Sequence, residues 1–424
     1  MTTARTTPAS STAAGDVDRI YRTNLSAGRA MIAEMTGGHV EVASEGAWVT
    51  SADGERFLNA GGYGVFITGA RHPIVEDEVI RQLRTHPVGT RMFLDPVAAR
   101  AAEMLSACTP AGLERIHFCG SGAEATEAAI KIARLQGRRR LVSMYGGYHG
   151  KTMGALSLTA RAAYQKPFEP LLPSVTHVTY SDVDELEAEL RRHPGEVCVI
   201  VEPVQGEAGV IVPEPGYLHT VRALCTRYGA FLVVDEIQTG LGRLGSWWGV
   251  DREAVVPDIL LSGKALGGGI LPVAAAICTD EAFGVLNRDP FLHTSTFSAA
   301  PLAMAAVCGA LRAIKEDDLV LRAQTLGAIL IPAVTRSLTR HLGPFVRAVR
   351  GRGLLIGIEF SEPGMAGEML VELISNRVIA NFSLNSDSVL RFTPPAILTE
   401  PDTEFLLAAL DNAAHTVGTR YQHS

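Results

Sequence analysis

An aspartate and a lysine stand where two short apolar segments end, and together they could do covalent chemistry. The segments, residues 231–234 and 259–261, are bounded by turn residues and are typical of strands buried on both faces of a parallel sheet. Asp235 follows the first segment, and Lys264 follows the second, just ahead of three glycines. Open α/β sheets bind ligands at the carboxyl ends of their strands. The pair therefore predicts a Schiff base between the Lys264 amine and an aldehyde cofactor whose ring nitrogen Asp235 keeps protonated.

Each of these two residues also has a plainer interpretation, in which Lys264 is a solvated loop lysine and Asp235 a helix N-cap. Their surroundings favour the chemical interpretation. DEIQTG at 235–240 and GKALGGG at 263–269 resemble the signature of the class III pyridoxal-phosphate (PLP) aminotransferases, which include ornithine, acetylornithine and putrescine aminotransferases. The resemblance extends from about Gly46 to Leu410. It implies PLP as the cofactor, Lys264 as its covalent anchor and general base, Asp235 at the ring nitrogen, and Gln238 as a donor to the ring oxygen.

A phosphate site is predicted where residues 119–125 (CGSGAEA) follow one strand and open a long helix. Small residues at a helix start expose backbone N–H groups, and the helix dipole favours an anion there. The same residues satisfy G-x-G-x-x-A, but a dinucleotide site also needs an acidic residue roughly 20 positions further on. That region reads RRRLVSMYGGYHG and contains none, so a nicotinamide enzyme is disfavoured. The family resemblance assigns Ser121, Gly122 and Ala123 to the cofactor phosphate.

The resemblance places further residues around the cofactor and the substrate. Tyr148 and His149 match an aromatic-His-Gly motif whose aromatic ring stacks on the pyridine ring. Ser295 and Thr296 match a pair that reaches the phosphate bound by the other subunit, which implies a homodimer with shared active sites. Tyr63 matches a tyrosine near the substrate.

A carboxylate-binding arginine and its cover are also implied by the resemblance. Arg391 matches an arginine that binds an α-carboxylate as a bidentate pair. In ornithine-type enzymes the glutamate matching Glu207 covers that arginine when an amine donor binds and uncovers it for glutamate or 2-oxoglutarate. The alternative is a structural salt bridge between domains. The chain departs from the family at Ser298-Ala299-Ala300, where relatives commonly have Gly-Gly-Asn, and at Gly120, where Asn is common.

Composition restricts the classes of protein that fit. The 424 residues are 47 % hydrophobic and 20 % charged, with a net charge of −7, which is typical of a globular protein and argues against nucleic-acid binding. The six cysteines and twelve histidines show no metal-ligand spacing, so no metal site is predicted. No uninterrupted apolar stretch approaches the roughly 18 residues of a membrane span. We expect a cytoplasmic protein.

Alternating strand and helix patterns predict an α/β protein of the PLP-dependent transferase fold type I. We expect a disordered tail at 1–15, an N-terminal segment at 16–85 that joins the small domain, a large PLP-binding domain with a mainly parallel sheet at 86–330, and a smaller α+β C-terminal domain at 331–424. Predicted helices cover residues 16–36, 72–84, 96–108, 123–135, 217–228, 364–377 and 401–417. Predicted strands cover residues 39–42, 47–49, 56–58, 115–118, 141–144, 197–201, 231–234, 259–261, 347–350, 354–360 and 389–392.

The leading functional hypothesis is a homodimeric PLP-dependent aminotransferase that moves a terminal (ω) amino group from a diamine or ω-amino acid to 2-oxoglutarate in two half-reactions. Putrescine, ornithine and acetylornithine are the donor types that the resemblance favours. Two alternatives stay open: a PLP-dependent aminomutase of the same fold, and an inactive PLP-binding regulatory relative.

Overall fold

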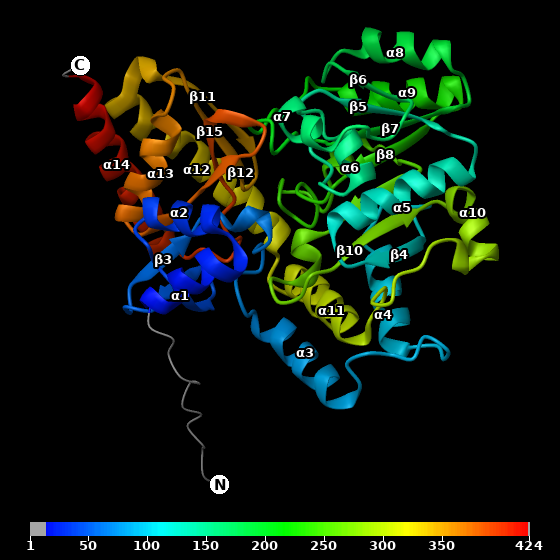
Figure 1. Ribbon diagram of the computed structural model, residues 1–424, viewed down its shortest axis with the longest axis horizontal. Coiled ribbons are helices and arrows are strands. Elements are labelled where there is room, and N and C mark those ends of the chain that lie inside the picture. Colours follow the sequence, from blue (N-terminus) through cyan, green and yellow to red (C-terminus); the bar gives the residue numbers. More distant parts are fainter. Residues whose placement is uncertain (1–13, 423–424) are drawn as a thin grey trace.

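The computed structural model describes residues 14–422, and the larger of its two lobes is built on a seven-stranded sheet (Figure 1). The strand order is β4-β10-β9-β8-β7-β5-β6, and only β10 runs antiparallel to the others. The strands are β4 (Arg115–Cys119), β5 (Arg140–Met144), β6 (Val175–Val178), β7 (Val197–Val201), β8 (Phe231–Asp235), β9 (Ile259–Ser262) and β10 (Ala274–Cys278).

Helices cover both faces of this sheet because alternate residues of its central strands point to opposite sides. Ile200 and Val233 pack in one apolar cluster with the buried face of α5 (Gly122–Leu135). Their neighbours Val201 and Val234 pack in another cluster with the buried face of α9 (Tyr217–Tyr228). The uninterrupted apolar strand segments read from the sequence therefore belong to a sheet with two cores.

The remaining helices of this lobe surround the sheet and extend below it (Figure 1). They are α3 (Pro73–Thr85), α4 (Pro96–Ser106), α6 (Met153–Leu158), α7 (Ala162–Gln165), α8 (Val183–Arg192), α10 (Asp280–Arg288) and α11 (Pro301–Glu316). α3 packs against α11 rather than with the N-terminal strands, although the predicted segment 16–85 grouped them.

The smaller lobe contains an antiparallel sheet in the order β11-β12-β15-β14. Its strands are β11 (Val346–Arg352), β12 (Leu355–Phe360), β14 (Asn381–Ser383) and β15 (Ser386–Phe392), and its helices are α12 (Leu319–Leu342), α13 (Met365–Ser375) and α14 (Glu400–Gln422). The predicted boundary at residues 330/331 falls inside α12, which is one continuous helix.

The N-terminal strands share a second four-stranded sheet with a strand from far along the chain. β1 (Glu41–Glu45), β2 (Trp48–Ser51) and β3 (Arg56–Asn59) form antiparallel pairs, and β13 (Val378–Ile379) adds to β3 in parallel. The predicted helix at 16–36 is broken into α1 (Ala14–Ile20), a π-helical turn (Tyr21–Leu25) and α2 (Ala27–Met35). The break lies at Ser26, whose backbone is extended and whose side chain caps α2.

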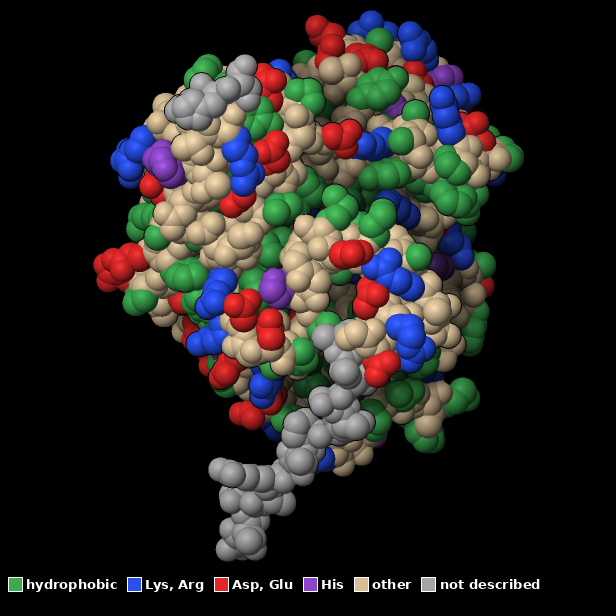
Figure 2. Space-filling model, turned by 60° about the vertical axis from the view of Figure 1, so that its left-hand side comes forward, with side chains coloured by type: hydrophobic (Ala, Val, Ile, Leu, Met, Phe, Trp, Pro, Cys, Tyr) green, Lys and Arg blue, Asp and Glu red, His purple; other side chains and the backbone are tan. Residues whose placement is uncertain are grey.

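Within the described residues, α12 extended to Phe345 is long and apolar enough to cross a membrane by length and composition alone. Its apolar residues include Leu326, Leu330 and Val334, which are buried in the main apolar cluster, and α12 packs against α14 and β11. Packing within the small lobe thus accounts for the buried part of this helix, which is 33 % of its apolar window. On the face shown in Figure 2, acidic and basic side chains are interspersed.

Candidate active site

A cavity of about 230 Å³ lies at the carboxyl ends of the central strands. Asp235 is the last residue of β8, Glu202 follows β7, and Lys264 lies two residues beyond β9. The cavity is therefore at the sheet edge where open α/β folds bind ligands. It is lined by Gly122, Ala123, Tyr148, His149, Gly150, Lys151, Glu202, Glu207, Asp235, Ile237, Gln238 and Lys264. Eight of these twelve are residues that the sequence predicted for the site.

Lys264 opens a short 3₁₀ turn (Lys264–Gly267) with a φ of +45°, a backbone conformation that costs a non-glycine residue free energy. Among the described residues its amine has no hydrogen-bond or ion-pair partner. Burial lowers the pKa of Lys264 below its usual value. A lysine held this way is easier to deprotonate, which is what a nucleophilic amine and general base require.

Asp235 is fixed in place by a buried histidine. The Nδ1 atom of His149 lies 2.8 Å from Oδ2 of Asp235, and the Ile237 N–H donates to Oδ1 at 3.1 Å. Burial opposes a charge on His149, but the hydrogen bond and charge of Asp235, together with the charge of Glu202, outweigh burial and raise the pKa of the imidazole. The His149 main chain is itself held by Thr159 and Thr126. This arrangement orients the carboxylate at the cavity wall.

The phosphate end of the site is the start of α5. Ser121 is the N-cap of α5, where its Oγ accepts from the Glu124 N–H at 3.3 Å, and it does not line the cavity. Gly122 and Ala123 do line it. A Cβ at Gly122 would lie 2.8 Å from the tip of the Ile237 side chain, so a larger residue here would require Ile237 to shift. An anion at this helix start would meet backbone N–H groups and the positive end of the helix dipole.

Glu207 and Arg391 form an ion pair at 2.7 Å, with side chains 5 % and 0 % exposed. Glu207 lines the cavity and Arg391 does not, so the carboxylate lies between the guanidinium and the cavity. The Nε and Nη2 atoms of Arg391 are buried without a partner among the described residues, and so is Nε2 of Gln238. Buried donors without acceptors are costly, which indicates a ligand with acceptor oxygens at this end of the site.

Tyr63, Ser295 and Thr296 are not brought into the cavity of this chain. Tyr63 is 55 % exposed, with a φ of +53°, next to Gly64, whose carbonyl accepts from the buried Arg243. Thr296 is exposed and Ser295 half-buried on a loop at the surface. The roles given to these three residues, including contact with the partner subunit's cofactor, stay predictions.

The loop that departs from the family pattern holds one strained residue. Ala299 has a φ of +54°, a region in which glycine is favoured, and the Ser298 hydroxyl donates to the Phe118 carbonyl at 2.6 Å. Ser298 is thus held by a hydrogen bond to β4, whereas Ala299 adopts a backbone conformation that costs a non-glycine residue free energy.

Sequence reasoning assigned no role to Glu202, which the structure places in the cavity wall. Burial raises the pKa of Glu202 to about 7, and its Oε2 accepts from the Tyr148 N–H at 3.1 Å. Glu202 therefore holds the main chain of Tyr148, which also lines the cavity. The available signal was a glutamate directly after the fully buried strand β7.

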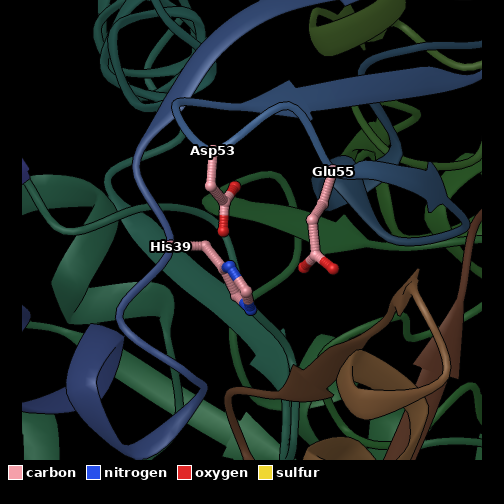
Figure 3. Close-up of side chains that lie close together, drawn as sticks. All are labelled: His39, Asp53 and Glu55. Carbon is pink, nitrogen blue, oxygen red and sulfur yellow. The ribbon is translucent and has the colours of Figure 1, made fainter.

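A second cluster of ligand-type side chains lies away from the cavity, where the turn between β2 and β3 meets the segment that precedes β1. His39, Asp53 and Glu55 place one nitrogen and two carboxylate oxygens within 4.8 Å of one another (Figure 3). Glu55 is paired with Arg377 at 2.7 Å, and Asp53 accepts from the Ser51 hydroxyl. Both carboxylates therefore already have a partner within the protein.

Comparison with known proteins agrees with this geometry. The family model for aminotransferase class-III matches residues 35–414. The ornithine aminotransferase from Toxoplasma gondii ME49 is 30 % identical, with a TM-score of 0.88 and 96 % of each chain covered. An (S)-enantioselective omega-transaminase from Thermomicrobium roseum is 28 % identical, with a TM-score of 0.87, covering 96 % of this chain and 100 % of that one. A PLP-bound amine transaminase from an uncultivated Pseudomonas species is 26 % identical, with a TM-score of 0.82 and coverage of 88 % and 94 %. The chain belongs to the class-III aminotransferase family and is a PLP-dependent transaminase of fold type I.

Proposed function

We propose that this transaminase takes a terminal amino group from a diamine or ω-amino acid and passes it to 2-oxoglutarate, acting as a cytoplasmic homodimer. The observation that carries the proposal is the buried Glu207–Arg391 pair at the cavity wall. A guanidinium that can bind a carboxylate is present, and a neighbouring carboxylate covers it. The similarity to ornithine aminotransferases and omega-transaminases supports the same substrate class.

The residues around the cavity fit PLP. The start of α5 would hold the phosphate, Asp235 the ring nitrogen, and the unpartnered Nε2 of Gln238 a ring oxygen. PLP supplies an electron sink that makes loss of the substrate α-proton feasible. Lys264, with its lowered pKa, holds and returns that proton. Tyr148, which lines the cavity, would stack on the ring and keep its plane in place.

The Glu207–Arg391 pair lets one cavity serve two kinds of substrate. A diamine or a terminal amine brings no carboxylate to this end of the cavity, so Glu207 can stay on Arg391. A 2-oxo acid brings an α-carboxylate that competes with Glu207 for the same guanidinium. An arginine–carboxylate contact of this kind is bidentate and strong.

The proposal is tested with Arg391→Ala, by following the two half-reactions separately through the cofactor's visible absorbance. We expect the KM for 2-oxoglutarate to rise by about 100-fold, corresponding to about 3 kcal/mol for a buried charged contact. The rate with putrescine, which has no carboxylate, should change less than about fivefold. Because the single change leaves Glu207 buried and unpaired, the double variant Arg391→Ala/Glu207→Ala provides a second measurement.

Equal loss in both half-reactions would refute the proposed role of the pair. A Lys264→Ala control should abolish both half-reactions, since neither proceeds without the reactive amine. Product formation that needs no added 2-oxo acid would instead indicate an aminomutase.

A further inference from the structure

We propose that Tyr164 and Arg161 are positioning residues for Glu207, and that they act through the Leu384–Asn385 turn of the small lobe. The inference rests on the proposed function, because it concerns how firmly Glu207 covers Arg391. It goes further by naming the contacts that set the balance between covered and uncovered arginine.

Glu207 is held by the turn as well as by Arg391. Its Oε1 bonds to Arg391, while its Oε2 accepts from the Leu384 N–H at 2.8 Å. The Glu207 carbonyl accepts from the Asn385 N–H, also at 2.8 Å. Glu207 belongs to the loop after β7, and the turn joins β14 to β15, so these bonds link the two lobes. Releasing Arg391 alone leaves the carboxylate attached to the turn.

The turn is in its own right anchored to the large lobe. The Tyr164 hydroxyl donates to the Leu384 carbonyl at 2.7 Å, and Arg161 donates to the same carbonyl. Arg161 also pairs with Asp387 at 3.1 Å. Both anchors come from α7 and the residue before it, and α7 is drawn next to the small-lobe sheet in Figure 1. The Asn385 side chain adds bonds to the carbonyls of Gly146 and Gly147.

Tyr164 also touches the cavity wall. The Lys151 ammonium lies over the Tyr164 ring, 3.9 Å from its centre, and Lys151 lines the cavity. One tyrosine therefore packs against the cavity wall with its ring and holds the turn with its hydroxyl.

These contacts give a direction for the effect. With its anchor intact, the turn keeps the Leu384 N–H on Glu207 and so favours the covered state of Arg391. Without the anchor the turn is freer, Glu207 is held less firmly, and an incoming carboxylate displaces it more easily. A ligand's apparent affinity rises with the fraction of protein in the state that binds it.

The test uses Tyr164→Phe, Arg161→Gln and the double variant as holoenzymes. Binding of glutarate, a dicarboxylate that cannot accept an amino group, is measured by calorimetry, and the KM values for 2-oxoglutarate and putrescine are measured alongside. We expect glutarate to bind about fivefold more tightly to Tyr164→Phe, the factor typical of one hydrogen bond, and tighter still to the double variant. The KM for 2-oxoglutarate should fall in parallel, while that for putrescine stays within about twofold.

Tyr228→Phe is the matched control, because it removes a hydroxyl that bonds to Glu187 on the outer helices of the large lobe. It should leave all three quantities unchanged. Unchanged or weaker glutarate binding in the double variant overturns the inference, as does an equal shift for both substrates. If Glu207→Gln tightens glutarate binding but the Tyr164 and Arg161 variants do not, Glu207 does cover Arg391, and the positioning role of Tyr164 and Arg161 is refuted. If Arg391→Ala leaves glutarate binding unchanged, the proposed function fails instead.

Discussion

Two buried glutamates in the loop that follows β7 should respond in opposite ways to the same substitution. Glu202 and Glu207 are 5 % and 4 % exposed. Glu207 has a cationic partner, Arg391, at 2.7 Å. Glu202 has no ion-pair partner among the described residues and accepts only the Tyr148 N–H. Glutamine keeps the shape and an acceptor oxygen but removes the charge, so it separates the cost of burying a charge from the gain of pairing it.

The expected change in the free energy of unfolding for Glu202→Gln follows from the pKa of Glu202. Burial raises this pKa from 4.5 to about 7, so between these values the folded protein holds a proton that the unfolded chain has lost. The native state therefore loses stability as the pH rises from about 4.5 to 7 and loses no more above that. At about 1.4 kcal/mol per unit, the loss is about 3 kcal/mol at pH 8 and below about 1 kcal/mol at pH 5. Glu202→Gln should recover this amount.

Glu207→Gln should instead destabilise the protein at pH 8. It leaves the Arg391 guanidinium buried with no carboxylate, and breaking a buried pair typically costs 3 to 5 kcal/mol, about the size of the gain at Glu202. The assay is the denaturant midpoint of both variants and the wild type at pH 5 and pH 8, with and without PLP. Destabilisation of both variants at pH 8, or a stabilisation by Glu202→Gln that is the same at both pH values, would refute the reasoning.

Two further predictions concern a buried ion-pair network and a close contact beside the cavity. Glu78 is buried in a network with Arg81, Arg100 and Arg312, and although burial acts against it, these arginines hold its pKa below the usual value. Glu78→Gln should lower the free energy of unfolding, measured with urea at pH 7, by about 2 kcal/mol. The difference from the wild type should shrink as the pH falls through the lowered pKa of Glu78. The control is Glu34→Gln, which removes an exposed ion pair and should leave the free energy of unfolding almost unchanged. A Cβ at Gly206 would lie 1.5 Å from Oε1 of Gln238, so Gly206→Ala must displace Gln238 and should weaken PLP binding, followed by absorbance titration, by about tenfold or more. Gly284→Ala, where the nearest atom is a flexible arginine tip at 3.9 Å, is the control; similar affinity in the two variants would contradict the assignment of Gln238 to the cofactor.

The local sequence determined the strand ends of the large lobe and what they carry. β7 and α9 have the predicted bounds, and β8 ends one residue later than predicted, at Asp235. These bounds could be predicted because an apolar segment followed by a turn residue indicates both a buried strand and the place where it ends. Lys264 and Asp235 could be predicted from the sequence for that reason, since strand ends of a parallel sheet meet at one edge.

Only the tertiary structure decided which of these residues touch. The bond between His149 and Asp235 joins positions 86 apart, and nothing local encodes it. β10 was missed because its small residues (AAAIC) show no pattern of their own, and its antiparallel direction depends on its neighbours β4 and β9. Propensity acts over a few residues, whereas burial and partner choice depend on the whole chain. For the same reason the hydrogen bond from Leu384 to Glu207 exists only once the two lobes are packed together.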